Sequence, residues 1–141
     1  MEYKRFNNSI FLRVDRGEEV LSKIIEVVEK EHVSLGTIEA IGACDKFTVG
    51  LYSVSKKQYF KKTYEGEFEI VSFLGNITTK DNKPYIHVHI ACGDSNNNVI
   101  GGHLNECRIS ATFEAKITVE NGSISRKIDE LTGLNIFDLG K

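Results

Sequence analysis

Three of the four histidines of this chain lie in one stretch, Tyr85 to Asn105. His87 and His89 alternate with isoleucine and valine, which is the period-two pattern of a strand with one apolar face. Both imidazoles therefore point to the same side of the strand, about 6.6 Å apart at a rise of about 3.3 Å per residue. Because imidazole nitrogen is a favoured ligand of zinc, this spacing indicates a metal site.

The third histidine is brought to the same patch by a turn. The run from Asp94 to Asn98 contains only Asp, Ser and Asn, and such residues tolerate left-handed backbone and bond to their own main chain. A hairpin folded about the centre of this run would place His89 opposite His103. His87 would then lie opposite Asn105. Since directly opposed residues share a face, with Cβ atoms roughly 4.5–5.5 Å apart, the three imidazoles are predicted to converge.

Three histidines with an open fourth position are the ligand pattern of catalytic zinc sites, whereas structural sites normally use four protein ligands. Cys92 has the wrong strand parity to join the histidines, and Cys107 lies too far along the strand. A closed, cysteine-rich site is therefore not expected, and a bound water of lowered pKa would be the nucleophile. The alternative is that the histidines lie on a sheet surface and only brace a subunit interface.

Two glutamates are candidates for the carboxylate that a metal-dependent reaction would need. Glu69 and Glu39 each lie among apolar residues of a predicted strand, where a carboxylate is costly unless it is paired or binds a metal. We expect Glu69 first, and Glu39 second, to act as a fourth ligand or as a general base next to the ligands. The alternative for each is a solvent-facing strand position. Cys44 has no adjacent base in the sequence, so a nucleophilic role is not expected for it.

The elements that position these residues are predicted to be mostly strands. One helix is expected at residues 18–31, from an apolar stripe at helical spacing with acidic residues in the first turn, and His32 follows it as a surface residue. Asn121-Gly122 predicts a tight hairpin between the last two strands. Besides the strand with His87 and His89, strands are expected at residues 9–14, 35–43, 47–54, 58–64, 67–77, 99–105, 109–119 and 124–128.

This pattern predicts one α+β domain over residues 1–141, with a largely antiparallel sheet and a core from about residue 9 to 128. The apolar tail, residues 131–139, is expected to dock on its own or on a neighbouring subunit. Three cysteines without a CxxC motif are most simply buried apolar residues. The N-terminus lacks the apolar core of a signal peptide, which predicts a cytoplasmic protein, and no apolar run reaches the roughly 18 residues of a membrane span.

The charge of the chain gives little support to nucleic-acid binding. The net charge is −2, and a nucleic-acid-binding protein usually has a basic balance or a basic stripe. The one local candidate is KKQYFKK, residues 56–62, in which four lysines surround two aromatic residues and could bind a single strand by charge and stacking. Strand alternation sends its lysines to both faces, so a charged sheet edge that prevents aggregation is the alternative.

Four blocks of the sequence resemble the plants-and-prokaryotes-conserved (PPC) domain in its stand-alone prokaryotic form. They are IEAIGACDKFTVGLYS, EGEFEIVSFLGNIT, HVHI at residues 87–90 and GGHL at residues 101–104, in the order of the family and within about residues 10–139. The resemblance implies a compact α+β fold that assembles as a homotrimer. Prokaryotic members are usually described as DNA-binding, as are plant relatives that carry an AT-hook. This chain has no such segment, and its only proline is Pro84.

The PPC family is also similar in fold to acetolactate decarboxylase, a zinc enzyme with an H-x-H pair followed, after a turn, by G-G-H. The matching positions here are His87, His89, Gly101, Gly102 and His103. The resemblance implies zinc or a similar ion more than any particular reaction, because function belongs to the site rather than to the fold. The sequence thus predicts a metal-dependent enzyme or small-ligand binder; the alternative is a DNA-binding regulatory protein without enzymatic activity.

Overall fold

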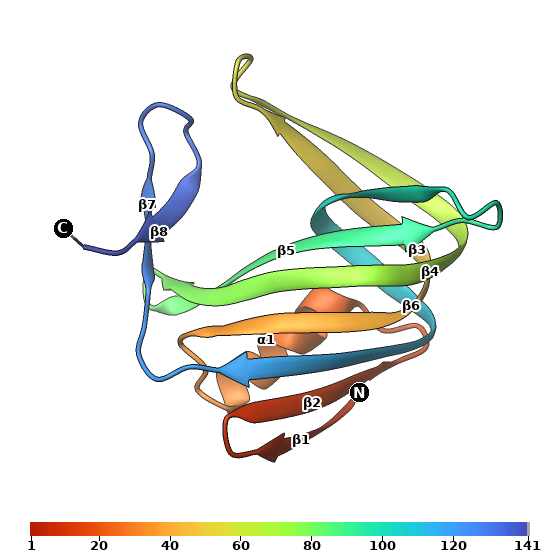
Figure 1. The fold of residues 1–141 in the computed structure, drawn as a ribbon, viewed down its shortest axis with the longest axis horizontal. Helices are drawn as coiled ribbons and strands as arrows, with labels where there is room; N and C mark the ends of the chain where they lie inside the picture. The colour runs from red at the N-terminus through yellow and green to blue at the C-terminus, as the bar shows by residue number, and fades with distance from the viewer. Residues whose placement is uncertain (141) are drawn as a thin grey trace.

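In the computed structural model, which describes residues 1–140, alternating apolar residues build long antiparallel strands, and one helix packs against the sheet (Figure 1). The expected single domain with an antiparallel sheet and one helix is confirmed, but the structure is mostly β. In chain order the elements are β1 (Glu2–Phe6), β2 (Ser9–Asp15), α1 (Val20–Lys30), β3 (Gly36–Ser53), β4 (Gln58–Lys80), β5 (Lys83–Gly93), β6 (Val99–Val119), β7 (Ser125–Ile128) and β8 (Asn135–Asp138). Within residues 1–140, no helix is long and apolar enough to span a membrane.

The six-stranded sheet has the order β1-β2-β6-β3-β4-β5, and β6 also pairs with β5. The strands β3, β4, β5 and β6 therefore form a closed ring of antiparallel pairs. Strand β6 achieves this by changing partner: Val99 to His103 pair with β5, and the strand then runs along β3 and β2. His103 lies at the change, opposite a residue of β5 on one side and of β3 on the other.

At three places, two strands that were predicted separately form one continuous strand in the structure. The expected breaks near residues 45–46, 65–66 and 106–108 fall inside β3, β4 and β6. At the first break, between the predicted strands 35–43 and 47–54, the strand continues with a register shift between Cys44 and Lys46. A bulge accommodates an extra residue without ending the strand, which explains the difference. Strand β1, which pairs with β2 from Glu2 to Phe6, was not predicted.

The helix is shorter than predicted at its N-terminus. It begins at Val20, because the Glu19 carboxylate accepts hydrogen bonds from the amides of Leu21 and Ser22, at 3.0 and 2.8 Å, and so acts as the N-cap. The predicted acidic first turn is wrong, since both glutamates precede the helix. At the other end, His32 is exposed and has a φ of 53°, so the prediction of a surface residue after the helix is confirmed.

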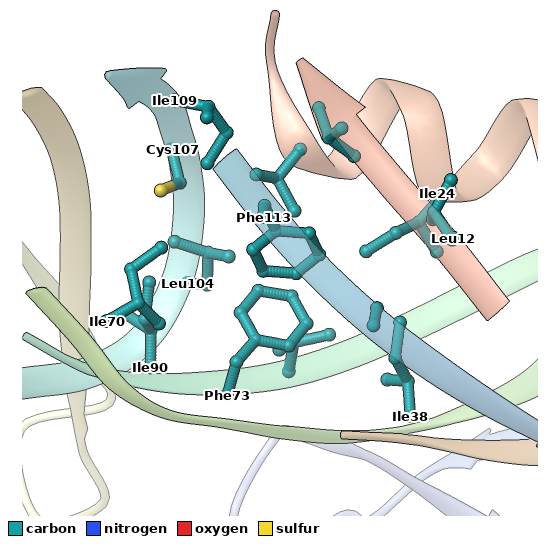
Figure 2. Packing of buried hydrophobic residues seen from close by; sticks show 14 of the residues in the cluster. Leu12, Ile24, Ile38, Ile70, Phe73, Ile90, Leu104, Cys107, Ile109 and Phe113 are labelled. Atoms are coloured by element: carbon teal, nitrogen blue, oxygen red, sulfur yellow. The ribbon is translucent and has the colours of Figure 1, made fainter. Parts of the chain in front are cut away.

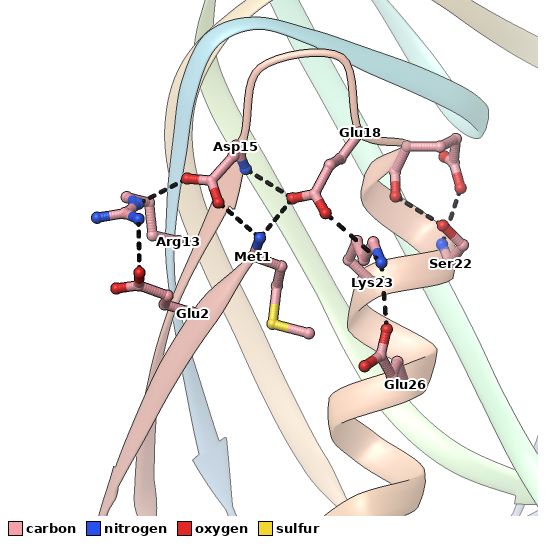
Figure 3. Close-up of polar contacts among 9 residues, drawn as sticks. Met1, Glu2, Arg13, Asp15, Glu18, Ser22, Lys23 and Glu26 are labelled. Carbon is pink, nitrogen blue, oxygen red and sulfur yellow. Dashed lines mark hydrogen bonds and ion pairs between the residues drawn. The ribbon is translucent and has the colours of Figure 1, made fainter.

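A network of ion pairs fixes the start of β1 beside this N-cap (Figure 3). The N-terminal amine of Met1 lies 2.6 Å from an oxygen of Asp15 and 2.8 Å from an oxygen of Glu18. Hydrogen bonds to these two carboxylates raise the pKa of the amine, and the bond from the amine is the main cause that lowers the pKa of each carboxyl. The network therefore ties the first strand to the turn between β2 and α1.

The core lies between the sheet and the helix (Figure 2). Phe73 of β4 and Phe113 of β6 meet edge to face with ring centroids 4.8 Å apart, and Ile24 of the helix is fully buried. Cys44, Cys92 and Cys107 are fully buried with free thiols, so the prediction that they act as buried apolar residues is confirmed.

Strands β7 and β8 form a second, separate hairpin. The predicted tight hairpin about Asn121-Gly122 is wrong: these residues lie in the connection after β6, and β7 pairs with β8 rather than with β6. In Figure 1 this C-terminal hairpin stands at the end of the sheet near the turn between β4 and β5. The amide of Thr79 donates to the carbonyl of Ile124 at 3.0 Å, which joins the hairpin to β4. The hairpin therefore forms a wall beside the sheet.

Candidate metal centre

Strand pairing brings the three predicted histidines into one cluster. Residues of β5 and β6 pair from His89 with His103 to Gly93 with Val99, so the predicted opposition of His89 and His103 is confirmed. The ring centroid of His87 lies 5.2 Å from that of His89 and 5.0 Å from that of His103. The centroids of His89 and His103 are 5.6 Å apart. One ligand nitrogen from each imidazole lies within 4.8 Å of the other two.

The predicted partner of His87 is wrong. The ladder between β5 and β6 ends at His89 and His103, because β6 then pairs with β3, so His87 does not lie opposite Asn105. His87 instead pairs with Asn76 of β4. The side-chain amide of Asn105 donates to the Tyr59 hydroxyl at 2.6 Å. The cluster forms nevertheless, because alternation along β5 alone places His87 on the face of His89.

Partial burial favours neutral imidazoles in this cluster. His87 and His103 are half-buried, whereas His89 is exposed. Burial, together with the smaller effects of the neighbouring His103, His89 and Arg126, lowers the pKa of His87 to about 4. Burial likewise lowers the pKa of His103, with a contribution from His89. Because a neutral imidazole is the form that binds a metal, His87 and His103 are in their ligand form at neutral pH.

The donor set fits a divalent ion with an open position. Across residues 1–140, no carboxylate or thiol joins the three imidazoles in a cluster of ligand atoms. Zinc–nitrogen distances of about 2.0–2.1 Å in a tetrahedral site would place the nitrogens about 3.4 Å apart. The nitrogens lie within 4.8 Å of one another, so they would have to move closer together to bind one ion. Three protein ligands leave one tetrahedral position for a small molecule.

The cluster lies in an open pocket of about 1000 Å³. The paired ends of β5 and β6 form its floor. Beyond the last β3–β6 pair, the β3–β4 hairpin continues alone as residues 51–60, here called the arm. The arm forms one wall of the pocket, and the C-terminal hairpin forms the opposite wall (Figure 1). The Tyr52 hydroxyl donates to the carbonyl of Thr132 at 2.7 Å, which connects the two walls.

Tyr59 of the arm lies beside His103 of β6. Its ring meets that of His103 edge to face, with centroids 6.1 Å apart. A Cβ on Gly50 would lie 2.1 Å from the Tyr59 ring, so the ring occupies the space that a side chain at this position would fill. The absence of a side chain at Gly50 thus allows the arm to fold close over the site.

Sequence analysis missed Arg126, which lines the same pocket from β7. Its guanidinium lies between two aromatic rings, 4.7 Å from the centroid of Tyr85 and 4.5 Å from that of Phe137. It donates to the side chains of Asn76 and Thr78 at 2.5 and 2.9 Å. No local pattern could have indicated this role, because it depends on the packing of β7 against β4.

Glu39 and Glu69 do not line the pocket. Glu39 of β3 pairs with Leu74 of β4, and Leu74 in turn pairs with His89 of β5. Glu39 therefore lies on the same face of the sheet as His89, but two strands away from it. Its carboxylate is exposed, and the Lys116 amine lies 4.0 Å from it. Glu69 is exposed and pairs with Gly93 at the far end of β5. A catalytic role for either glutamate stays a prediction.

The basic segment 56–62 is divided between two places. Lys56 and Lys57 lie at the exposed tip of the arm, and Lys61 and Lys62 line the pocket. The Lys62 amine lies 4.8 Å from the ring centroid of Tyr64. The lysines therefore form no single stripe.

Solved structures with the same fold extend from bacteria to archaea. A protein of Bacteroides thetaiotaomicron, described as a candidate DNA-binding protein, has 27% identity and a TM-score of 0.94, covering 97% of this chain and 96% of its own. A metal-containing protein of Archaeoglobus fulgidus has 32% identity and a TM-score of 0.86, covering 96% of each chain. Acetolactate decarboxylase from Bacillus subtilis, at 15% identity and a TM-score of 0.55, covers 82% of this chain and 54% of the enzyme, and shows likeness of fold alone.

No curated protein matches this chain significantly. The family model of the Plants and Prokaryotes Conserved (PCC) domain matches residues 1–121. This match includes the whole histidine cluster, and it confirms the resemblance that the HVHI and GGHL motifs indicated. The chain belongs to the PCC domain family.

Proposed function

We propose that this protein binds a divalent metal ion, zinc in the first instance, through His87, His89 and His103, and offers its open coordination position to a small ligand. The observation that carries the proposal is the cluster itself, with three imidazole nitrogens within 4.8 Å of one another at the floor of a pocket. The metal-containing relative from Archaeoglobus fulgidus, at 32% identity, supports it.

A bound divalent ion would supply Lewis acidity at the open position. The chain's own residues would do the rest. Tyr59 covers His103 and limits access of water from the side of the arm. Tyr85, Leu134 and Phe137 make the opposite side of the pocket apolar. A ligand would therefore be held between aromatic walls above the imidazoles.

The test is the metal content of protein made without a polyhistidine tag, measured by elemental mass spectrometry. Wild type is expected to carry about one zinc per chain, because three imidazole ligands bind zinc tightly. His89→Ala should lose the metal. His32→Asn, which removes an exposed histidine outside the cluster, is the matched control and should retain it. Metal-free wild type that also fails to bind added zinc would contradict the proposal.

We further propose that the protein assembles as a homotrimer. A second open pocket lies on the outer face of β2, β3 and β4. It is lined by four apolar residues that are each more than half exposed: Phe11, Ile41, Val71 and Leu74. An exposed apolar patch of this kind usually marks a protein–protein contact. Copies of this chain are the simplest partner, and the family resemblance implies three of them.

The alternative function is DNA binding without enzymatic activity. Two observations favour it: the description of the Bacteroides thetaiotaomicron relative, and the exposed lysines at the tip of the arm. If it holds, a gel-shift titration should show micromolar binding that weakens steeply with salt, and Lys56→Gln with Lys57→Gln should reduce the salt slope by about two. Binding that is absent below millimolar concentration would remove this alternative.

A further inference from the structure

Several cationic and aromatic residues line the pocket around the histidines, and none of the acidic residues within 1–140 does. Arg126, Lys61 and Lys62 all line it. The chain as a whole has 20 acidic and 18 basic residues and a net charge of −2, so the lack of carboxylates is a local property of this pocket. A concave surface lined by one sign of charge concentrates ions of the opposite sign.

Arg126 is the cation held most rigidly in this pocket. Its guanidinium lies between Tyr85 and Phe137, and Nε, Nη1 and Nη2 donate to Thr78, Asn135 and Asn76, respectively. A guanidinium has five N–H donors, so two remain for another acceptor. These contacts fix its orientation before any ligand arrives, which lowers the entropy lost on binding.

No counter-ion for Arg126 comes from residues 1–140. No carboxylate of this part of the chain lies within 4.0 Å of its guanidinium. Burial lowers the pKa of Arg126, although an arginine remains charged at physiological pH. A partly buried charge without a partner is costly, and an incoming anion would relieve that cost.

Strand register places Arg126 beside the histidines. Asn76, which accepts a hydrogen bond from Arg126, is the direct partner of His87 in the β4–β5 ladder. Directly opposed residues have Cβ atoms roughly 4.5–5.5 Å apart. Thr78 and Tyr85 form the next pair on the same face, and Arg126 contacts both. The guanidinium therefore covers two successive pairs of the ladder, one of which contains a proposed metal ligand.

We infer that the pocket takes a small organic anion with an apolar body, and that Arg126 binds its carboxylate or phosphate group beside the histidine cluster. This inference rests on the proposed metal site, because the two share one pocket. The guanidinium matches the geometry of both anionic groups, and such charge-assisted hydrogen bonds are roughly twice as strong as neutral ones. Tyr85, Leu134, Ile136 and Phe137 suit the apolar part of the ligand.

The test is a titration followed by amide chemical shifts, on metal-free and on zinc-loaded protein. The probes are benzoate, phenylphosphonate and benzamide, the last being the neutral isostere of benzoate. We expect the better anion to bind about tenfold more tightly than benzamide, since charge-assisted hydrogen bonds are roughly twice as strong as neutral ones. The shifts should be centred on Asn76, Tyr85 and Arg126. The ratio of benzoate to phenylphosphonate affinity distinguishes a carboxylate ligand from a phosphate ligand.

The matched variants are Arg126→Met and Lys127→Met, which remove one positive charge each from neighbouring positions of β7. Lys127 pairs with Asp138 at 3.4 Å and does not line the pocket. Arg126→Met should abolish the preference for the anion, and Lys127→Met should leave it unchanged. Equal binding of benzoate, phenylphosphonate and benzamide by wild type, or an anion preference that survives Arg126→Met, would overturn the inference.

Arg126→Met could release the C-terminal hairpin, so Arg126→Lys is the second variant. It keeps the charge and should retain part of the anion preference while the amide shifts of Ile128 and Asn135 stay at their wild-type values. Complete loss of the preference in Arg126→Lys with an intact hairpin would contradict this expectation and count against the inference that the positive charge at this position binds the anion. If His89→Ala fails to change metal content, the metal proposal fails. Anion binding to the metal-free protein is measured separately and can still succeed.

Discussion

His89 and His103 are directly opposed in the last pair that β5 and β6 share. On its other side, His103 faces Gly50 of β3, the position over which the Tyr59 ring lies. The change of partner by β6 at this point thus brings β3, β5 and β6 together at one imidazole. His87, one alternation away on β5, connects the same cluster to β4.

Zinc should stabilise the protein only while the cluster is intact. An ion that binds the folded state alone raises the free energy of unfolding by about 2.7 kcal/mol at a free concentration about 100 times its Kd. Differential scanning fluorimetry of metal-free protein is expected to show a rise in Tm of several degrees with added zinc. The rise should vanish in His89→Ala and persist in His32→Asn. A zinc-dependent rise in His89→Ala would mean that the ion binds elsewhere.

The stability of the metal-free protein should fall as the pH is lowered from about 6.5 towards 4. Burial lowers the pKa of His87 from 6.5 to about 4, so between these values the unfolded chain binds more protons than the folded one. Stability contributed by this group therefore rises with pH across that window. Tm measured at pH 7 and at pH 4.5 should differ less in His87→Gln than in wild type. An equal difference would show that His87 titrates normally.

Gly75→Ala should distort the strand that carries His87. A Cβ at this position would lie 2.3 Å from the carbonyl oxygen of His87, and a backbone atom cannot move aside cheaply. We expect a loss of about 1–3 kcal/mol in the free energy of unfolding and weaker zinc binding. Gly93→Ala is the control, because its nearest neighbour would be 3.7 Å away. Urea denaturation compares the two variants, and equal stability would contradict the close contact.

Glu19→Ala should destabilise the start of the helix. The carboxylate of Glu19 accepts hydrogen bonds from Leu21, Ser22 and the amide of Cys107. Removing an N-cap costs about 1 kcal/mol, and the contact with β6 adds to the effect. Glu29→Ala, at an exposed position of the same helix, should change the free energy of unfolding little. If both variants unfold at the same urea concentration, the cap contributes nothing.

Ile41→Lys should prevent assembly without unfolding the subunit. Ile41 is exposed in the apolar patch on the outer face and pairs with Glu114 of β6, so a lysine there has an acidic neighbour. Light scattering after size exclusion should give about three times the 15.8 kDa chain mass for wild type and a smaller mass for the variant. Val54→Lys, at the tip of the arm, is the control and should remain assembled. A monomeric wild type at micromolar concentration would contradict the trimer.

The sequence by itself determined the histidine cluster, because the cluster depends on local patterns, namely strand alternation and one turn. Alternation fixes the face of His87 and His89, and the polar run from Asp94 to Asn98 closes a turn between two strands of matched register. The helix, the buried cysteines and the family were likewise available from short patterns. The predicted breaks inside β3, β4 and β6 were not, because turn-forming residues can also occupy bulges in long strands.

Only the tertiary structure decided what surrounds the cluster. The change of partner by β6, which closes the four-strand ring, replaces Asn105 with Asn76 as the neighbour of His87. Strand β7 pairs with β8, although Asn121-Gly122 predicted a hairpin with β6. This pairing places Arg126 in the pocket, far in sequence from the histidines. Such contacts depend on packing between distant segments, and a local pattern carries no information about which distant partner a strand will meet.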